Sequence, residues 1–317
     1  MQRFLTLFAL AASLATASPT NLVWSRAGAT GKVVFQFPGN QTMLENVDLL
    51  PNGHLIMTTL ASSDVYTVDP EAKTPKAEKL LTLPGNGVLT GTTHLGRDLY
   101  AVVSGVPTAI GSPIFIRGSF NIFVISVNSK SVVQTIPVQE SALVNGLYAL
   151  PHKPHIILAA DSALGRILRI DTRSKGVTTV LTHDALGFGN FTDLPIGVNG
   201  VVIRDDYLYF TNSRLGTFSK VRIDDDGKPI GQPEVIAVLP GVGPTHAFDD
   251  FDMDKQGNAY VATHPSSVTK ITPGGSLTTA FDGGAAVLDR PTSVVFGKSG
   301  KVLYGVTFGG QVTKVTL

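Results

Sequence analysis

A short segment with the pattern strand, tight turn and second strand recurs along this chain. The clearest copies are residues 45–57, 197–213 and 250–261, in which β-branched and aromatic residues flank turn-forming ones. Looser copies begin at Thr90, Asn145 and Thr292. The copies start about 40 to 55 residues apart, and a period of this length is typical of β-propellers and solenoids.

Each copy except the last is followed by two further strand-like runs, so a complete repeat has four strands. The last copy is followed only by residues 311–315, whereas residues 32–37 form a run before the first copy that has no partner. Pairing these two runs completes the last sheet and leaves no open edge in a ring of sheets. We therefore predict an all-β, six-bladed β-propeller with four strands per blade, whose last blade is closed by the N-terminal strand.

Composition narrows the classes of function. The chain has no cysteine, which excludes a disulfide framework, a thiol nucleophile and a thiolate metal site. Its formal net charge is +1, which gives no electrostatic footprint for nucleic acid. We expect a monomer with no nucleic-acid partner.

The N-terminal residues predict export. Residues 4–14 are largely apolar, and Ala15-Thr16-Ala17 has the small residues of a signal-peptidase site. We expect residues 1–17 to be a signal peptide, residues 18–317 to form the propeller, and the protein to be secreted without a membrane span. Asn40 and Asn190 begin glycosylation sequons, which would be used in the secretory pathway.

Polar residues begin several copies of the repeat. When Leu55, Tyr209 and Tyr260 are aligned, Glu45, Asn199 and Asp250 share one repeat position, and Asn145 begins another copy. Neighbouring strands of a blade are antiparallel. The inner strands therefore begin at one mouth of the channel, and two kinds of loop lie at the same mouth: the loops that lead into each blade and the loops between its second and third strands. Two long apolar loops, residues 104–120 and 183–198, belong to this mouth. Long loops in compact folds are usually functional or disordered.

The fold and these strand-start residues resemble the SMP-30/gluconolactonase/LRE-like family. The resemblance implies that Glu45, Asn199 and Asp250 hold a divalent cation, typically calcium, and that Asn145 faces metal or substrate. Carboxylate and amide oxygens suit such a hard cation. The alternative is that these polar residues only satisfy backbone groups at the mouth.

A secreted fungal branch of this superfamily is more similar. It shares the Glu-Asn start and Pro-Asn-Gly turn of residues 45–53, and the Asn-Gly-Leu and Ala-Asp-Ser-Ala-Leu-Gly runs at 145–147 and 160–165. Members of this branch resemble hetero-Diels–Alderases of tropolone–sesquiterpenoid biosynthesis. The resemblance implies a pericyclase of secondary metabolism that joins a tropolone quinone methide to a humulene-type olefin. Its partners would be small apolar natural-product intermediates.

Cycloaddition needs orientation of two apolar partners and hydrogen bonds to the developing oxygen charge, and it requires no cofactor. The candidate donors are Asn145, Asn199, Thr245 and His246. The candidate substrate-binding residues are Phe115, Phe188 and Phe191.

Two other functions stay open. One is a metal-dependent lactonase, although the aspartate that animal lactonases carry after the asparagine matching Asn145 is replaced here by Gly146. Apolar loops also suit a sugar lactone poorly, because its hydroxyl groups need hydrogen-bond partners. The other is a secreted propeller that binds without catalysis.

Overall fold

The structure is a computed structural model of the 317-residue chain, and it describes residues 24–26, 29–39, 43–109, 112–190 and 195–317. The predicted signal peptide and the Asn40 sequon lie outside these residues. The described chain is almost entirely β-structure. Its two helical turns are η1 (Asp184–Leu186) and α1 (Gly284–Val287). Among the described residues, no helix is long and apolar enough to cross a membrane.

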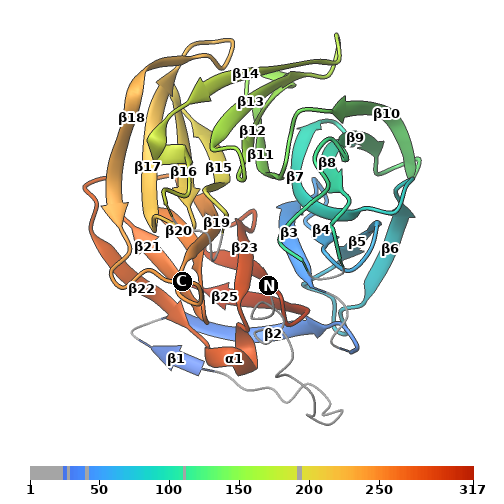
Figure 1. Cartoon of the computed structure of the whole chain (residues 1–317). Helices are drawn as coiled ribbons and strands as arrows, with labels where there is room; N and C mark the ends of the chain where they lie inside the picture. Colours follow the sequence, from blue (N-terminus) through green and yellow to red (C-terminus); the bar gives the residue numbers. More distant parts are fainter. Residues whose placement is uncertain (1–23, 27–28, 40–42, 110–111, 191–194) are drawn as a thin grey trace.

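The sheets are six blades arranged in a ring (Figure 1). The first blade contains β3 (Leu44–Leu49), β4 (Leu55–Thr59), β5 (Asp64–Val68) and β6 (Ala77–Thr82). The second contains β7 (Val88–Gly96), β8 (Leu99–Gly105), β9 (Phe120–Ser126) and β10 (Ser131–Val138). The third contains β11 (Val144–Leu150), β12 (Lys153–Asp161), β13 (Arg166–Asp171) and β14 (Gly176–Thr182).

The second half of the ring repeats this plan. The fourth blade contains β15 (Val198–Arg204), β16 (Tyr207–Asn212), β17 (Thr217–Ile223) and β18 (Pro229–Val238). The fifth contains β19 (Phe248–Met253), β20 (Ala259–Thr263), β21 (Ser267–Ile271) and β22 (Leu277–Asp282). The sixth contains β23 (Pro291–Phe296), β24 (Val302–Thr307), β25 (Gln311–Thr316), β2 (Ala29–Gln36) and β1 (Trp24–Arg26).

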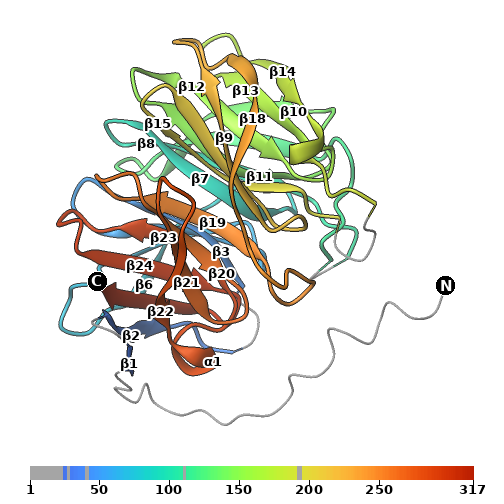
Figure 2. The same cartoon turned by 90° about the vertical axis from the view of Figure 1, so that its left-hand side faces the viewer.

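The inner strand of each blade touches the inner strands of both neighbouring blades. Consecutive contacts join β3, β7, β11, β15, β19 and β23, and β23 returns to β3. The inner strands therefore form a closed ring around a central channel, and the blades stack side by side around it in the view of Figure 2.

The apolar core is divided among the interfaces between blades. Each of the six clusters of buried side chains joins residues of two adjacent blades. The cluster between the second and third blades, for example, packs Ile122 and Ile136 against Leu147 and Ile157. A blade therefore buries its faces only when it stands between its two neighbours.

The predicted closure of the last blade is confirmed. Strand β2 pairs antiparallel with β25 from Thr30 opposite Thr316 to Gln36 opposite Gln311. The main chain of Phe37 then donates a hydrogen bond to Gly310 at 2.9 Å. Sequence patterns did not predict β1, which adds a fifth strand outside β2.

Removal of residues 1–37 should therefore expose the edge of β25 and the cluster into which Phe37 packs. We expect a loss of several kcal/mol of stability, which lowers the melting temperature by about 10 °C or more, together with aggregation. Differential scanning calorimetry and light scattering measure both effects. A truncation that begins at Trp24 keeps β2 and serves as the control. An unchanged melting temperature after the longer truncation would contradict closure by β2.

Candidate functional site

Six equivalent residues stand near the starts of the inner strands, at one mouth of the channel. In each blade the pairing of the inner strand has an irregularity directly after this position. These residues are Glu45, Thr90, Asn145, Asn199, Asp249 and Thr292, and the exposed fraction of each is 9 % or less. We call this set the polar ring.

The strand pairing corrects the sequence alignment at two positions. In the first blade Ile56, which pairs with Asp48, takes the place given to Leu55. The second correction concerns the fifth blade. Tyr209 pairs with Val202, and Tyr260 pairs with Asp252, so the two tyrosines are equivalent as expected. However, the turn of the fifth blade has one more residue than that of the fourth. Asn199 lies ten residues before Tyr209, and the residue ten before Tyr260 is Asp250. The strand pairing instead makes Asp249 the equivalent of Asn199, because each lies three residues before the partner of its tyrosine.

Asp250 has its own hydrogen-bond partners. Its Oδ1 accepts from the main-chain nitrogen of Phe251 at 2.8 Å, and its Oδ2 accepts from Nδ2 of Asn46 at 2.6 Å. Asn46 lies on β3 and Asp250 on β19, so this bond joins the first and fifth blades across the channel. Both oxygens of the Asp250 carboxylate therefore already accept a hydrogen bond, one from the main chain of its own strand and one from Asn46 across the channel.

Close approach of neighbouring inner strands requires glycine next to the polar ring. A Cβ on Gly91 would lie 2.3 Å from the main-chain oxygen of Asn145, and one on Gly146 would lie 2.6 Å from that of Asn199. Residues with side chains cannot enter these gaps without moving a backbone. The Gly146 that departs from the animal lactonases is therefore a packing requirement of this chain.

Carboxyl groups gather in the channel. Burial raises the pKa of Glu45 well above its ordinary value, and the negative charges of Asp249 and Asp250 raise it further. Burial also raises the pKa of Asp250 to about 7 and that of Asp48 to about 7. The pKa of Asp252 is raised for the same reason. Charging these groups costs free energy because the channel removes their water.

The polar ring has oxygen atoms left for a ligand. Nδ2 of Asn199 donates to Oγ of Ser213 at 2.8 Å and to Oδ1 of Asp249 at 2.9 Å, so both of its hydrogens are used, and its Oδ1 accepts no hydrogen bond from another described residue. The side chains of Glu45 and Asn145 make no hydrogen bond to any other described residue. Within the described chain, no three His, Cys, Asp or Glu side chains group as a metal site. Two carboxylates and two amides remain a donor set that fits a hard cation.

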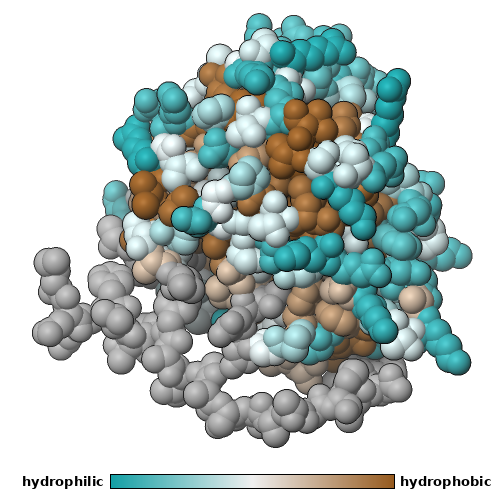
Figure 3. All heavy atoms as spheres, turned by 90° about the vertical axis from the view of Figure 1, so that its right-hand side faces the viewer, coloured by the Kyte–Doolittle hydropathy of each residue, from teal (hydrophilic) through white to brown (hydrophobic). Residues whose placement is uncertain are grey.

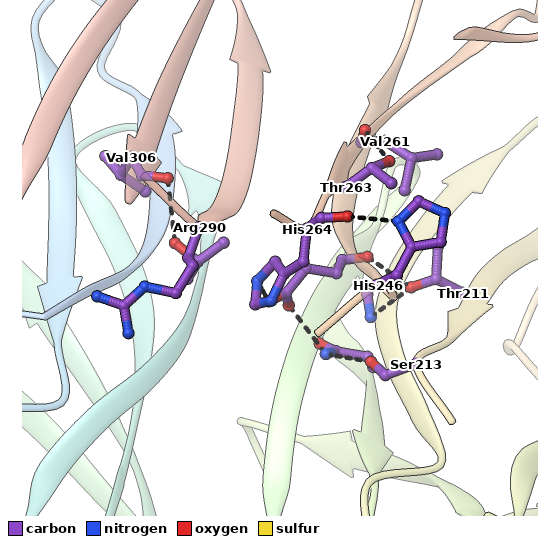
Figure 4. Close-up of polar contacts among 12 residues, drawn as sticks. Thr211, Ser213, His246, Val261, Thr263, His264, Arg290 and Val306 are labelled. Atoms are coloured by element: carbon purple, nitrogen blue, oxygen red, sulfur yellow. Dashed lines mark hydrogen bonds and ion pairs between the residues drawn. The ribbon is translucent and has the colours of Figure 1, made fainter. Parts of the chain in front are cut away.

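Histidines from two loops of the fifth blade meet beside the polar ring (Figure 4). Nδ1 of His246 lies 2.9 Å from the main-chain oxygen of His264, and the main chain of His246 pairs with Gly243. The imidazole of His246 thus holds its loop against the main chain of His264, and Nε2 of His246 stays available for other contacts. Thr245 lies at the exposed tip of the same turn.

His264 was not predicted from the sequence. Its Nε2 lies 3.3 Å from Oδ2 of Asp249, and their side chains are 16 % and 13 % exposed. The contact has the distance of an ion pair but not the angle of a hydrogen bond, so this buried nitrogen has no hydrogen-bond partner in the described chain. Asp249 lies on β19 and His264 in the loop that follows β20, and no local sequence motif predicts their contact.

Phe115 is partly buried and packs against the core at the base of its loop. Its ring centroid lies 5.1 Å from that of Phe120, and it joins the cluster between the second and third blades. The neighbouring Ile114 and Ile116 are 57 % and 51 % exposed. These two isoleucines are the more exposed apolar side chains of the loop, and the predicted contact of Phe115 with substrate stays a prediction.

The other predicted loop residues are placed only in part. Phe188 is partly buried, after η1, and Asn190 is exposed in the turn that follows. Phe191 and the remainder of the Asn190 sequon lie outside the described residues. The loop is anchored by Asn212, whose Nδ2 donates to the main-chain oxygen of Ala185 at 3.0 Å and to that of Gly187 at 2.7 Å.

Two cavities within the described residues lie away from this mouth, at the other ends of the strands. The larger, of about 690 Å³, separates the second and third blades and is lined by Leu95, Leu99, Val124, Val133, Gln134, Pro154, His155, Thr172, Arg173 and Lys175. The smaller, of about 240 Å³, lies between the fourth and fifth blades. Figure 3 shows apolar surface among polar side chains on one side of the ring, and Val133 on β10 is 57 % exposed.

Phe115→Ala should lower stability, because the ring leaves a gap in a packed cluster. We expect a loss of about 1 to 3 kcal/mol in the free energy of unfolding, since the ring is only partly buried. Ile114→Ala, which removes an exposed side chain, should stay within about 0.5 kcal/mol of the wild type. Urea unfolding measures both changes. Equal stability of the two variants would contradict the packing of Phe115.

The pKa of Asp250, raised to about 7, gives stability a definite pH dependence. The folded state holds the proton more tightly than the unfolded chain, so stability falls as pH rises from about 4 to about 7. The slope for one such group is on the order of 1 kcal/mol per pH unit. In metal-free buffer, Asp250→Asn should flatten this decline, whereas the exposed Asp225→Asn should not. Melting temperatures between pH 4 and pH 7 test this expectation, and parallel curves for all three proteins would contradict it.

Comparison with known proteins agrees with this architecture. The model of the SMP-30/Gluconolactonase/LRE-like region matches residues 174–308. A gluconolactonase from Xanthomonas campestris has a similar structure, with a TM-score of 0.67 and 13 % identity over 92 % of this chain and 90 % of its own. At this identity the likeness concerns the fold alone.

Two relatives are similar over most of the sequence. A proposed hetero-Diels-Alderase of Phoma sp is 26 % identical over 300 residues, which cover 85 % of this chain and 83 % of the relative. A second, named asR5, of Sarocladium schorii, is 25 % identical over 312 residues, which cover 85 % and 75 %. The resemblance that the strand starts indicated is thereby confirmed: the chain is similar to the SMP-30/gluconolactonase/LRE-like region over residues 174–308, and to hetero-Diels-Alderases over most of its length.

Proposed function

We propose that this protein is a hetero-Diels–Alderase-type pericyclase of secondary metabolism. The observation that carries the proposal is its similarity to two proteins of that name over 85 % of the chain. In the proposed reaction, a tropolone quinone methide adds to a humulene-type olefin and forms a dihydropyran ring. One carbon–oxygen bond and one carbon–carbon bond form together, so no group leaves and no nucleophile is needed.

The mouth of the channel suits this chemistry. Two partners held face to face gain rate mainly from orientation, and exposed apolar side chains such as Ile114 and Ile116 provide a surface for a hydrocarbon. Donors beside it would stabilise charge on the reacting oxygen. Asn145 has an unengaged amide for this purpose, whereas both amide hydrogens of Asn199 are already bonded. Asn199 is therefore better placed to hold Asp249 than to contact substrate.

Export is part of the proposal. The signal-peptide pattern of residues 1–17 indicates that the enzyme acts in the secretory pathway or outside the cell, where the sequons at Asn40 and Asn190 would be used. The cycloaddition itself needs no cofactor.

A metal-dependent lactonase is the second candidate. It is favoured by the raised pKa of Glu45 beside Asp249 and Asp250, because a bound cation would relieve the repulsion among these carboxyl groups. Glu45, Asn145, Asn199 and Asp249 would hold the cation. It would polarise a carbonyl group for hydrolysis.

The test is to generate the tropolone quinone methide in the presence of humulenol, with and without the protein. We expect a faster reaction and one dominant enantiomer of the dihydropyran. Phe188→Ala should slow the reaction by about tenfold and reduce the enantiomeric excess at a near-normal melting temperature, since about 1.4 kcal/mol of orientation corresponds to a factor of ten.

Val133→Ala, on the far side of the second blade, is the matched control and should leave rate and stereochemistry unchanged. A chelator should also have little effect. Identical rates and racemic product in both flasks would refute the pericyclase, and chelator-sensitive hydrolysis of a lactone would then support the second candidate.

A further inference from the structure

The cavity of about 690 Å³ between the second and third blades lies at the ends of the strands opposite the polar ring. Small-molecule sites commonly have volumes of about 300 to 1,000 Å³, and this cavity falls within that range. Part of its lining is apolar: Leu95, Leu99 and Pro154 are half-buried, and Val124 is buried. A hydrocarbon chain or ring that lies here therefore has much of its apolar surface removed from water.

A β-bulge places Val133 in the lining of the same cavity. Val132 pairs with Ile125 and Gln134 with Val124, so Val133 has no partner on β9. In the other five blades, the pairing of the third and fourth strands is irregular near the start of the third strand, whereas in the second blade the irregularity lies near its end. Bulges re-aim side chains, and this one gives the cavity a valine that is 57 % exposed.

The third blade brings positive charge to this cavity. His155, Arg173 and Lys175 line it, and no aspartate or glutamate is among the described residues of the lining. The side chains of Arg173 and Lys175 are exposed, and within the described chain they form neither an ion pair nor a hydrogen bond. The carboxylate of the preceding Asp171 already accepts from the main-chain nitrogens of Arg173 at 2.8 Å and Ser174 at 3.3 Å. The two cations therefore lack an anionic partner.

The next interface between blades shows the contrast. There Nζ of Lys153 lies 2.6 Å from Oδ1 of Asp226, and Nε of Arg169 donates to the main-chain oxygen of Asp226 at 2.7 Å. Asp226 belongs to the loop between β17 and β18, which is equivalent in the fourth blade to the loop of Arg173 and Lys175 in the third. The interface of the third and fourth blades thus contains its own anion, whereas the described lining of the cavity between the second and third blades contains none.

A hydrogen bond between the two blades holds the charged loop beside the apolar lining. Nε2 of Gln134 on β10 donates to the main-chain oxygen of Thr172 at 2.6 Å. Thr172 is also tied to β12, because its nitrogen and its Oγ1 donate to the main-chain oxygen of His155 at 2.8 and 3.1 Å. The base of the loop is therefore fixed, and the exposed cations that follow it stay at the rim of the cavity.

We propose that this cavity binds an amphipathic organic anion, a molecule with an apolar body and one carboxylate. The apolar body lies against Leu95, Leu99 and Val133, and the carboxylate meets Arg173 and Lys175. Arginine suits such a group, because its guanidinium can donate two parallel hydrogen bonds to a carboxylate. The site is separate from the mouth, so the inference goes beyond the proposed function and does not depend on it.

The test compares octanoate with 1-octanol, which has the same chain length without the charge, and with butyrate, which has the charge on a shorter chain. Binding of each to the purified wild-type protein is followed in ¹H–¹⁵N NMR spectra, which also locate the site. We expect octanoate to shift the amide signals of Val133, Gln134, Arg173 and Lys175. It should bind about tenfold more tightly than either comparison compound, because only octanoate uses both parts of the cavity.

In the double variant Arg173→Gln, Lys175→Gln, the affinity for octanoate should fall about tenfold, to that of octanol, and the affinity for octanol should not change. Val133→Ser should weaken the binding of both compounds about threefold, because the chain loses apolar contact. The controls are Arg117→Gln, at the opposite mouth, and Val235→Ser, on β18. Each changes an exposed side chain of the same type and should bind both compounds as the wild type does.

If the double variant does not fold, salt replaces it. Raising sodium chloride from about 0.05 M to about 0.5 M should weaken the binding of octanoate to the wild type several-fold and should not weaken that of octanol. Equal affinities of octanoate and octanol for the wild type, an equal loss in Arg117→Gln, or shifts confined to the mouth would overturn the proposal. Because these measurements need no turnover and concern another part of the molecule, their outcome is distinct from that of the cycloaddition assay.

Discussion

The antiparallel pairing of β2 with β25 is the contact on which the rest of the structure depends. A blade of this protein shares its apolar side chains with the blades on either side, so an unclosed sixth blade would leave two interfaces incomplete. The mouth depends on the same pairing. Glu45 and Asn46 of the first blade approach Asp249 and Asp250 of the fifth only because the sixth blade stands between them and holds their spacing. The polar ring is therefore complete only when the sixth blade closes the propeller.

The sequence predicts the architecture well because the propeller is periodic. Alternating strands, turn residues and the unpaired first run are local signals, and together they fix the number of blades and the closure. The site is harder to predict because it depends on single-residue offsets and on loop packing. One additional residue in a turn moves the ring position from Asp250 to Asp249. Within one loop, Phe115 is partly buried against the core, whereas its neighbours Ile114 and Ile116 are exposed. The contact of His264 with Asp249 joins a loop to an inner strand with no shared sequence pattern, so the sequence alone does not predict it.

The carboxyl groups of the channel show where stability and function compete. Asp250 is held by two hydrogen bonds, yet the pKa of Asp250 is raised, because the lost water outweighs these bonds. Glu45 has no hydrogen-bond partner among the described residues and stands near two other acids. A chain selected for stability alone would have an apolar residue in place of Glu45, like the apolar residues that fill the interiors of the blades. Acids with raised pKa values are typical of functional sites, and here Glu45 and Asp250 stand at the mouth with the polar ring, whereas Asp48 and Asp252 lie further along the same inner strands.

The sharing of one blade by the first and last strands has a consequence for the ancestry and redesign of such proteins. Since β2 already lies against β25, the blades keep their cyclic order around the ring, but the point at which the chain begins is not fixed by that order. The loop between the third and fourth strands of any other blade is topologically equivalent to the present seam, and a chain circularly permuted there would rebuild the same ring with its seam in that blade. The loops around the mouth, which carry the specificity, are thus free to be exchanged one blade at a time, while the six interfaces behind them stay unchanged.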